Sequence, residues 1–177
     1  MISLTIPNQV TILGFLFIFL YISSFLFGDS GWLSFLFLFC AGFTDALDGF
    51  LARQLKQESF LGSILDPLRD RVILAAILWN FCLINPKTWP IIEVIIVAEI
   101  LFFTSWFFDF SLVNERKFKW QHIFGKTRQL GHLVFGGLGV LRILPVDIAV
   151  ICMAACSLFL LAVRILRLLI YSIFVTE

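Results

Sequence analysis

The chain has 177 residues, of which 60% are hydrophobic and only 14% are charged. In soluble proteins about a quarter of all residues are charged, so this chain has far fewer charges than a soluble protein. A chain this apolar is also not intrinsically disordered. Its 22 Phe and five Trp residues also exclude a nucleic-acid-binding protein, which needs a basic face. We therefore expect an integral membrane protein whose surroundings are membrane lipid, with no nucleic acid as a partner.

Six apolar runs follow one another along the chain, and each is long enough to cross a bilayer as a helix. Turn signals such as Asn85-Pro86 and Pro145 separate them. The runs lack the two-residue alternation of a transmembrane barrel, and open strands have no hydrogen-bond partners in lipid. The sequence predicts an all-α fold, a single domain over 1–177 that forms a bundle of six transmembrane helices, with spans near 9–27, 32–51, 67–84, 90–110, 128–144 and 147–170.

Positive charges are distributed unevenly between the two ends of this six-helix arrangement. One end receives only Lys87 and Arg142, whereas the other receives 11 Lys and Arg residues. Lys and Arg in short loops are retained on the cytoplasmic side, so both termini are expected in the cytoplasm. The 11 residues are Arg53, Lys56, Arg69, Arg71, Arg116, Lys117, Lys119, Lys126, Arg128, Arg164 and Arg167.

Four aspartates flank the connection between the second and third expected spans: Asp45, Asp48, Asp66 and Asp70. A carboxylate near hydrocarbon costs a few kcal/mol, so acids at such positions indicate a functional site. The first two are about 60° apart around a helix and the last two about 40° apart, so each pair shares one helical face. If residues 53–65 fold the two helices side by side, four acidic groups meet at one membrane edge.

Four neighbouring carboxylates require protons or cations to compensate their charge. Oxygen ligands without accompanying His or Cys favour Mg²⁺, Mn²⁺ or Ca²⁺, and two such ions would clamp a phosphate or diphosphate. Gly49 and Gly62 would let the backbone approach that ligand closely. A cation or proton-coupled transporter and a structural membrane partner are the alternatives, but transporters place such acids near the midplane, often in repeated halves.

The stretch from Asp45 to Asp70 follows the pattern D-x2-D-G-x2-A-R-x8-G-x3-D-x3-D without a gap. A chance match to its fixed positions is on the order of 10⁻¹⁰ per starting residue. The chain therefore closely resembles the CDP-alcohol phosphotransferase family, and within it the bacterial phosphatidylglycerophosphate synthases in particular.

This resemblance implies an enzyme that moves a phosphatidyl group from CDP-diacylglycerol to an alcohol and releases CMP. It implies a pair of divalent ions, Mg²⁺ or Mn²⁺, held by Asp45, Asp48, Asp66 and Asp70, and it makes Asp70 the catalytic base. It places the cytidine nucleotide against Asp45, Gly49, Ala52, Arg53 and Gly62. It further implies a homodimer in a bacterial-type inner membrane, with the active site on the cytoplasmic side.

The resemblance also suggests a small alcohol or alcohol phosphate as acceptor, with glycerol 3-phosphate first. Gly125-Lys126 resembles the Gly-Lys before the fifth span of the bacterial synthases, and Arg128 adds a second cation. Lys126 and Arg128 are therefore the expected acceptor-binding residues. Two arginines usual in that group are Gly14 and Ala98 here, which leaves inositol phosphate, serine, phosphatidylglycerol or another polyol as alternative acceptors.

Overall fold

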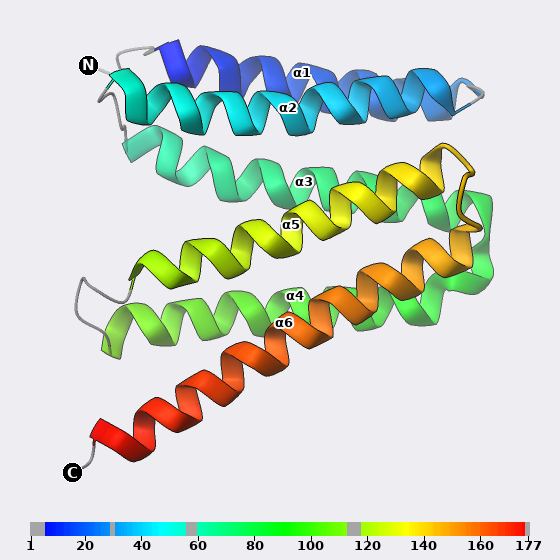
Figure 1. Cartoon of the computed structure of the whole chain (residues 1–177). Helices are drawn as coiled ribbons and strands as arrows, with labels where there is room; N and C mark the ends of the chain where they lie inside the picture. The colour runs from blue at the N-terminus through cyan, green and yellow to red at the C-terminus, as the bar shows by residue number, and fades with distance from the viewer. Residues whose placement is uncertain (1–5, 29–30, 56–59, 113–117, 176–177) are drawn as a thin grey trace.

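A computed structural model gives the fold of the chain and describes residues 6–28, 31–55, 60–112 and 118–175. Throughout these residues the regular structure is helical, which confirms the predicted all-α class. Figure 1 shows the long helices lying roughly along one direction. In chain order the elements are α1 (Ile6–Leu26), α2 (Trp32–Leu55), α3 (Phe60–Ile84), the short 3₁₀ helix η1 (Pro86–Thr88), α4 (Trp89–Leu112), α5 (Phe118–Val140) and α6 (Val146–Val175).

Three helices within the described residues are long and apolar enough to cross a bilayer: α1 as a whole, α2 over Trp32–Ala52 and α6 over Val146–Arg167. Helices that are able to span a membrane are therefore present, as the composition predicts. The crossing of the bilayer by α3, α4 and α5 stays a prediction. The first half of α3 carries both acidic and basic residues, whereas α1 carries no charged residue.

Two helices begin earlier than the apolar runs predict. α3 begins at Phe60 instead of residue 67, and α5 begins at Phe118 instead of residue 128. A helix continues past an expected span because its backbone hydrogen bonds do not need an unbroken apolar run. The added part of α3, residues 60–66, mixes apolar residues with Gly, Ser and Asp, and the added part of α5 contains Lys and Gln, which are good helix formers. As a consequence, Asp66 and Asp70 lie within α3, and the connection from α2 shortens to 56–59.

The helices pack as neighbouring antiparallel pairs. α1 packs along α2, α5 packs along α6, and α3 contacts both α1 and α5. Both chain termini lie at the same end of the bundle, on the left of Figure 1, where α2 is also connected to α3 and α4 to α5. The late residues of α2 and the early residues of α3 therefore meet at this end.

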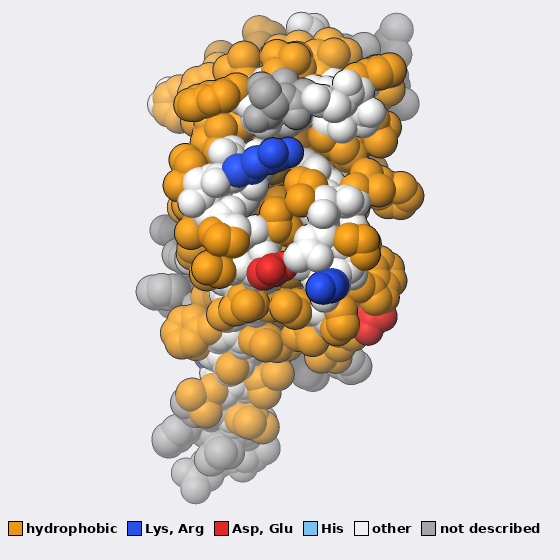
Figure 2. Space-filling view, turned by 90° about the vertical axis from the view of Figure 1, so that its right-hand side faces the viewer, with side chains coloured by type: hydrophobic (Ala, Val, Ile, Leu, Met, Phe, Trp, Pro, Cys, Tyr) orange, Lys and Arg blue, Asp and Glu red, His pale blue; other side chains and the backbone are white. Residues whose placement is uncertain are grey.

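The outward-facing side chains are mostly large and apolar. Phe19, Trp79 and Phe159 are 64%, 64% and 67% exposed, and similar residues recur along every long helix. Figure 2 looks onto the end of the bundle opposite the termini, where hydrophobic side chains cover most of the surface and charged ones occur singly. An apolar surface this extensive is not compatible with water, and it agrees with helices surrounded by lipid.

The interior combines apolar packing with buried polar pairs. Ile77 and Phe81 of α3 are fully buried beside Met153 of α6. Asn80 Nδ2 donates a hydrogen bond to Tyr21 Oη over 3.0 Å and so joins α3 to α1. These two polar side chains bind each other inside the bundle, where lipid offers them no partner.

Close helix packing makes Gly139 intolerant of a side chain. A Cβ atom there would lie 2.5 Å from Phe81 Cζ and 2.9 Å from Ala149 Cβ, where α5 meets α3 and α6. Such overpacking costs about 1–3 kcal/mol, so Gly139→Leu should lower the unfolding temperature of the protein in detergent. Val134→Leu, on an exposed face of the same helix, is the control, and equal losses in both variants would contradict the packing.

Candidate functional site

The four aspartates come from the neighbouring ends of two helices, Asp45 and Asp48 from α2 and Asp66 and Asp70 from α3. Asp66 lies within electrostatic range of Asp45 and Asp48. Asp70 lies within the same range of Asp45 and Asp66. The structure therefore brings the four residues together at the end of the bundle that carries the chain termini.

A fully buried arginine, Arg69 of α3, lies between the two aspartates of α2. Its Nη1 donates to Asp48 Oδ2 over 2.5 Å, and its Nη2 donates to Asp45 Oδ1. The hydroxyl of Thr11 in α1 donates to the same Asp48 oxygen over 2.9 Å. Asp48 is thus held from α1 and α3 at once.

α5 adds two polar side chains to the four aspartates. Gln129 Nε2 donates a hydrogen bond to Asp70 Oδ1. Lys126 is exposed and lies within electrostatic range of Asp66. One of the two predicted acceptor-binding residues therefore lies beside the aspartates, together with a glutamine that nothing in the sequence singles out.

Arg128, the other predicted acceptor residue, is buried in a separate contact. Its Nη2 is 3.1 Å from Glu99 Oε2 in α4. Its guanidinium carbon lies 3.8 Å from the centre of the Phe102 ring, and that of Arg164 in α6 lies 4.4 Å from the same ring. Arg128 is nevertheless within electrostatic range of Asp70.

Arg128, Arg164 and Arg71 together form a basic cluster that adjoins Asp70. Arg128 is within electrostatic range of both other arginines, and the Arg71 guanidinium carbon lies 4.8 Å from the Phe103 ring centre. Two buried nitrogens of Arg128, Nε and Nη1, have no hydrogen-bond partner among the described atoms. Buried donors of this kind suit an anionic ligand such as a phosphate.

The residues predicted to line the nucleotide are described in part. A Cβ atom added at Gly49 would meet no described atom within 4 Å, so none of the described side chains fills the space on that side of α2. Ala52, one turn further on, is half-buried. Arg53 and Gly62 lie on α2 and α3, but their side-chain positions are outside the described part of the chain.

The carboxylates have the right chemistry for a hard divalent ion. Among the described residues, however, no three His, Cys, Asp or Glu side chains converge closely enough to hold a metal. The Arg69 guanidinium contributes to this, because it binds one oxygen of Asp45 and one oxygen of Asp48 that a metal ion would otherwise use. The donor set fits a divalent ion, but the carboxylates are not drawn around a common point.

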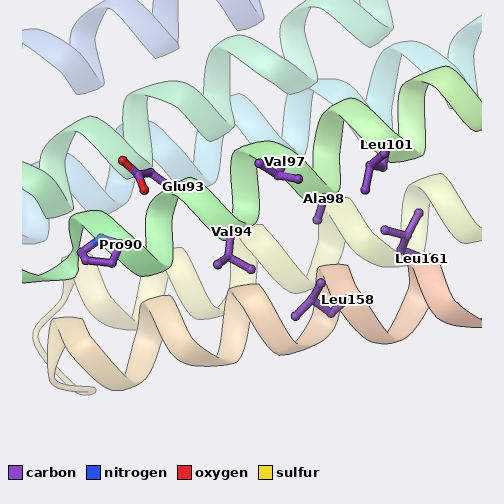
Figure 3. A pocket seen from close by; sticks show the side chains of 8 residues that line it. All are labelled: Pro90, Glu93, Val94, Val97, Ala98, Leu101, Leu158 and Leu161. Atoms are coloured by element: carbon purple, nitrogen blue, oxygen red, sulfur yellow. The ribbon is translucent and has the colours of Figure 1, made fainter.

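A shallow groove between α4 and α6 lies outside this site. Figure 3 shows its lining, in which Ala98 and the neighbouring side chains are apolar and Glu93 is the exception. Ala98, where the resemblance would place an arginine, lines this groove together with Leu158 and Leu161 of α6. No aspartate of the four lines this groove, so it is not the candidate active site.

The lipid-facing helices, with a charged cluster at one end of the bundle, are those of an integral membrane protein. The family model for CDP-alcohol phosphatidyltransferases matches residues 4–176. The chain belongs to this family, as the aspartate motif predicts.

Curated relatives share about a third of the aligned residues. A CDP-diacylglycerol–glycerol-3-phosphate 3-phosphatidyltransferase of Haemophilus influenzae is 32% identical over 62% of this chain and 60% of its own length. The enzyme of that name from Cereibacter sphaeroides is 34% identical over 52% and 44%. A cardiolipin synthase (CMP-forming) of Rattus norvegicus is 36% identical over 38% and 23%. The chain thus matches about 60% or less of the length of these three relatives, and no solved structure matches it.

Proposed function

We propose that this chain transfers a phosphatidyl group from CDP-diacylglycerol to the hydroxyl of glycerol 3-phosphate and releases CMP. The family supports the reaction type, and the names of the bacterial relatives support the acceptor. The observation that carries the proposal is the set of four motif aspartates at one end of a lipid-facing bundle. There the acyl chains of the donor would stay in lipid while its head group and the acceptor arrive from water.

Asp70 would act as the general base. Because Gln129 occupies its Oδ1, its Oδ2 is left to accept the proton of the acceptor hydroxyl. The acceptor oxygen then forms a bond to the phosphorus that carries diacylglycerol, and the bond from that phosphorus to the oxygen of CMP breaks. Such assistance contributes about 10²–10⁴-fold to the rate.

Asp45, Asp48, Asp66 and Asp70 are the proposed ligands of two divalent ions, Mg²⁺ or Mn²⁺. When bound, such ions neutralise a diphosphate and stabilise its leaving oxygen. The open space beside Gly49 and the small side chain of Ala52 would admit the cytidine nucleotide. Arg53 and Gly62 are assigned to the same pocket by the motif.

The acceptor phosphate would bind between Lys126 and the basic cluster. Lys126 is within electrostatic range of Asp66, and Arg128 is within electrostatic range of Asp70 and has two buried nitrogens without a hydrogen-bond partner among the described atoms. This arrangement supplies the positive charge that Gly14 and Ala98 do not. A phosphate held there would bring its own hydroxyl near Asp70.

Replacing Lys126 should weaken acceptor binding without stopping the reaction. Loss of one exposed contact to a phosphate predicts that Lys126→Ala raises the KM for glycerol 3-phosphate by about five- to tenfold, with little change in kcat. Lys87→Ala, exposed and remote from the aspartates, is the matched control. An unchanged KM in the Lys126 variant would favour an uncharged acceptor.

A second acceptor, phosphatidylglycerol, is favoured by the similarity to cardiolipin synthases. Its free hydroxyl would reach Asp70 from within the bilayer. Inositol phosphate, serine and other polyols are the remaining alternatives. We also propose that both termini and the site face the cytoplasm of a bacterial-type inner membrane, and that the protein is a homodimer.

The experiment that tests the function uses purified protein, CDP-diacylglycerol, Mg²⁺ or Mn²⁺, and a panel of acceptors. We expect CMP to appear with glycerol 3-phosphate, and the lipid product to be phosphatidylglycerophosphate. Product formed only with phosphatidylglycerol would support the second acceptor. Absence of CMP with every acceptor would contradict the proposed function, and metal uptake into liposomes would then favour a transporter.

A further inference from the structure

Arg69 of α3 binds two of the four aspartates directly. It is fully buried, and its two terminal nitrogens are each bound to a different carboxylate of the aspartate cluster. Charge-assisted hydrogen bonds of this kind are short and strong. In the described arrangement, Arg69 therefore neutralises part of the charge that a divalent ion would otherwise compensate.

The surroundings of Arg69 are shaped to hold it there. Its side chain crosses α1 at Gly14, where a Cβ atom would lie 3.1 Å from Arg69 Nη1, 3.2 Å from Arg69 Cδ and 2.9 Å from Thr44 Oγ1. Glycine in a helix interior costs about 0.5–1 kcal/mol relative to alanine, so its presence at position 14 has a steric reason. Because Gly14 of α1 has no side chain, the Arg69 side chain of α3 can occupy that space.

The bound oxygens are ones that a metal would need. Arg69 takes Oδ1 of Asp45 and Oδ2 of Asp48, and Thr11 donates to the second of these oxygens as well. A fixed positive charge at hydrogen-bond distance from two ligands also repels a cation that approaches them. This accounts for the lack of a preformed three-ligand metal site among the described residues.

We propose that Arg69 is an internal counter-ion that competes with divalent metal for Asp45 and Asp48, and that Gly14 is the residue that lets it do so. Metal binding then requires the exchange of the guanidinium for the ion. Arg69 is a positioning residue in this role: it keeps the two carboxylates together without metal and sets the metal concentration at which the site fills. The inference rests on the proposed function in assigning metal to these aspartates.

The test measures metal affinity directly, from the electron paramagnetic resonance signal of free Mn²⁺ titrated with the full-length protein in detergent. Arg69→Gln removes the charge but keeps a hydrogen-bond donor, and it should lower the apparent Kd for Mn²⁺ by about tenfold or more. Arg69→Lys keeps the charge and should stay nearer the parent protein. Lys87→Gln, an exposed cation remote from the aspartates, should not change the Kd.

A second readout separates competition from a purely structural role. Arg69→Gln should unfold at a lower temperature than the parent protein in EDTA, and added Mn²⁺ should raise its unfolding temperature by more than it raises that of the parent. Equal or weaker Mn²⁺ binding by folded Arg69→Gln would overturn the proposal. If that variant does not fold, Gly14→Ala decides the matter, because crowding Arg69 should tighten Mn²⁺ binding and an unchanged Kd would overturn the competition.

These outcomes do not depend on catalysis. CMP release by the parent protein together with no effect of Arg69→Gln on Mn²⁺ binding would leave the proposed function standing and remove the competition. Tighter Mn²⁺ binding by Arg69→Gln, without CMP release by the parent protein under any condition, would support the competition and contradict the proposed function.

Discussion

Asp70→Asn is expected to reduce the rate of CMP release by about 10²–10⁴-fold. The amide cannot take the proton of the acceptor hydroxyl, whereas it keeps the size of the side chain. The other aspartates remain, so binding of CDP-diacylglycerol should be reduced less than turnover. The measurement is a steady-state assay of CMP with saturating glycerol 3-phosphate, alongside equilibrium binding of the donor.

Asp147→Asn is the matched control for this substitution. Asp147 is exposed at the start of α6, and its carboxylate accepts a hydrogen bond of 2.6 Å from Asn85, which an asparagine oxygen can also accept. It should leave the rate unchanged. Full activity of Asp70→Asn would show that another group accepts the proton.

Glu99→Gln is expected to destabilise the bundle. Glu99 pairs with Arg128 over 3.1 Å, and both side chains are largely buried, with 15% and 11% exposed. Arg71 and Arg164 lie within electrostatic range of Arg128, so removing the carboxylate leaves the buried Arg128 near two like charges and without its own counter-charge. Breaking a buried pair from one side costs about 3–5 kcal/mol, which should appear as a lower unfolding temperature in detergent.

The companion variants identify the cause. Glu99→Gln combined with Arg128→Met removes both charges and should recover much of the lost stability, which gives a measurable coupling between the two sites. Glu93→Gln changes an exposed acid on the same helix and should have little effect. No recovery in the double variant would show that the ion pair does not account for the loss.

The all-α fold could be predicted from the length of the apolar runs, because in lipid a helix is the element that hydrogen-bonds all of its own backbone N–H and C=O groups. The ends of the helices could not be predicted, since a helix continues beyond the apolar run that signals it. α3 extends back to Phe60 through a mixed segment, and α5 extends back to Phe118 through a more polar one. The earlier start of α3 matters for the site, because it places Asp66 and Asp70 on a rigid helix instead of at its edge.

The aspartate cluster could be predicted because its spacing is local to two helix ends. Arg69 lies inside the same motif, but its sequence position predicted only a positive charge at one end of the bundle and not its two carboxylate partners. The contacts of Thr11 and Gln129 come from α1 and α5, far along the chain. Such partners depend on the packing of whole helices, which no short pattern contains.

The position of the nucleotide tests the central claim most directly. An experimental structure of the protein with CDP-diacylglycerol and Mn²⁺ should show the cytidine diphosphate between the end of α2 and the start of α3, with its diphosphate beside Asp45 and Asp66. A nucleotide bound elsewhere, for example in the groove between α4 and α6, or a complex in which none of the four aspartates approaches the diphosphate, would contradict the account.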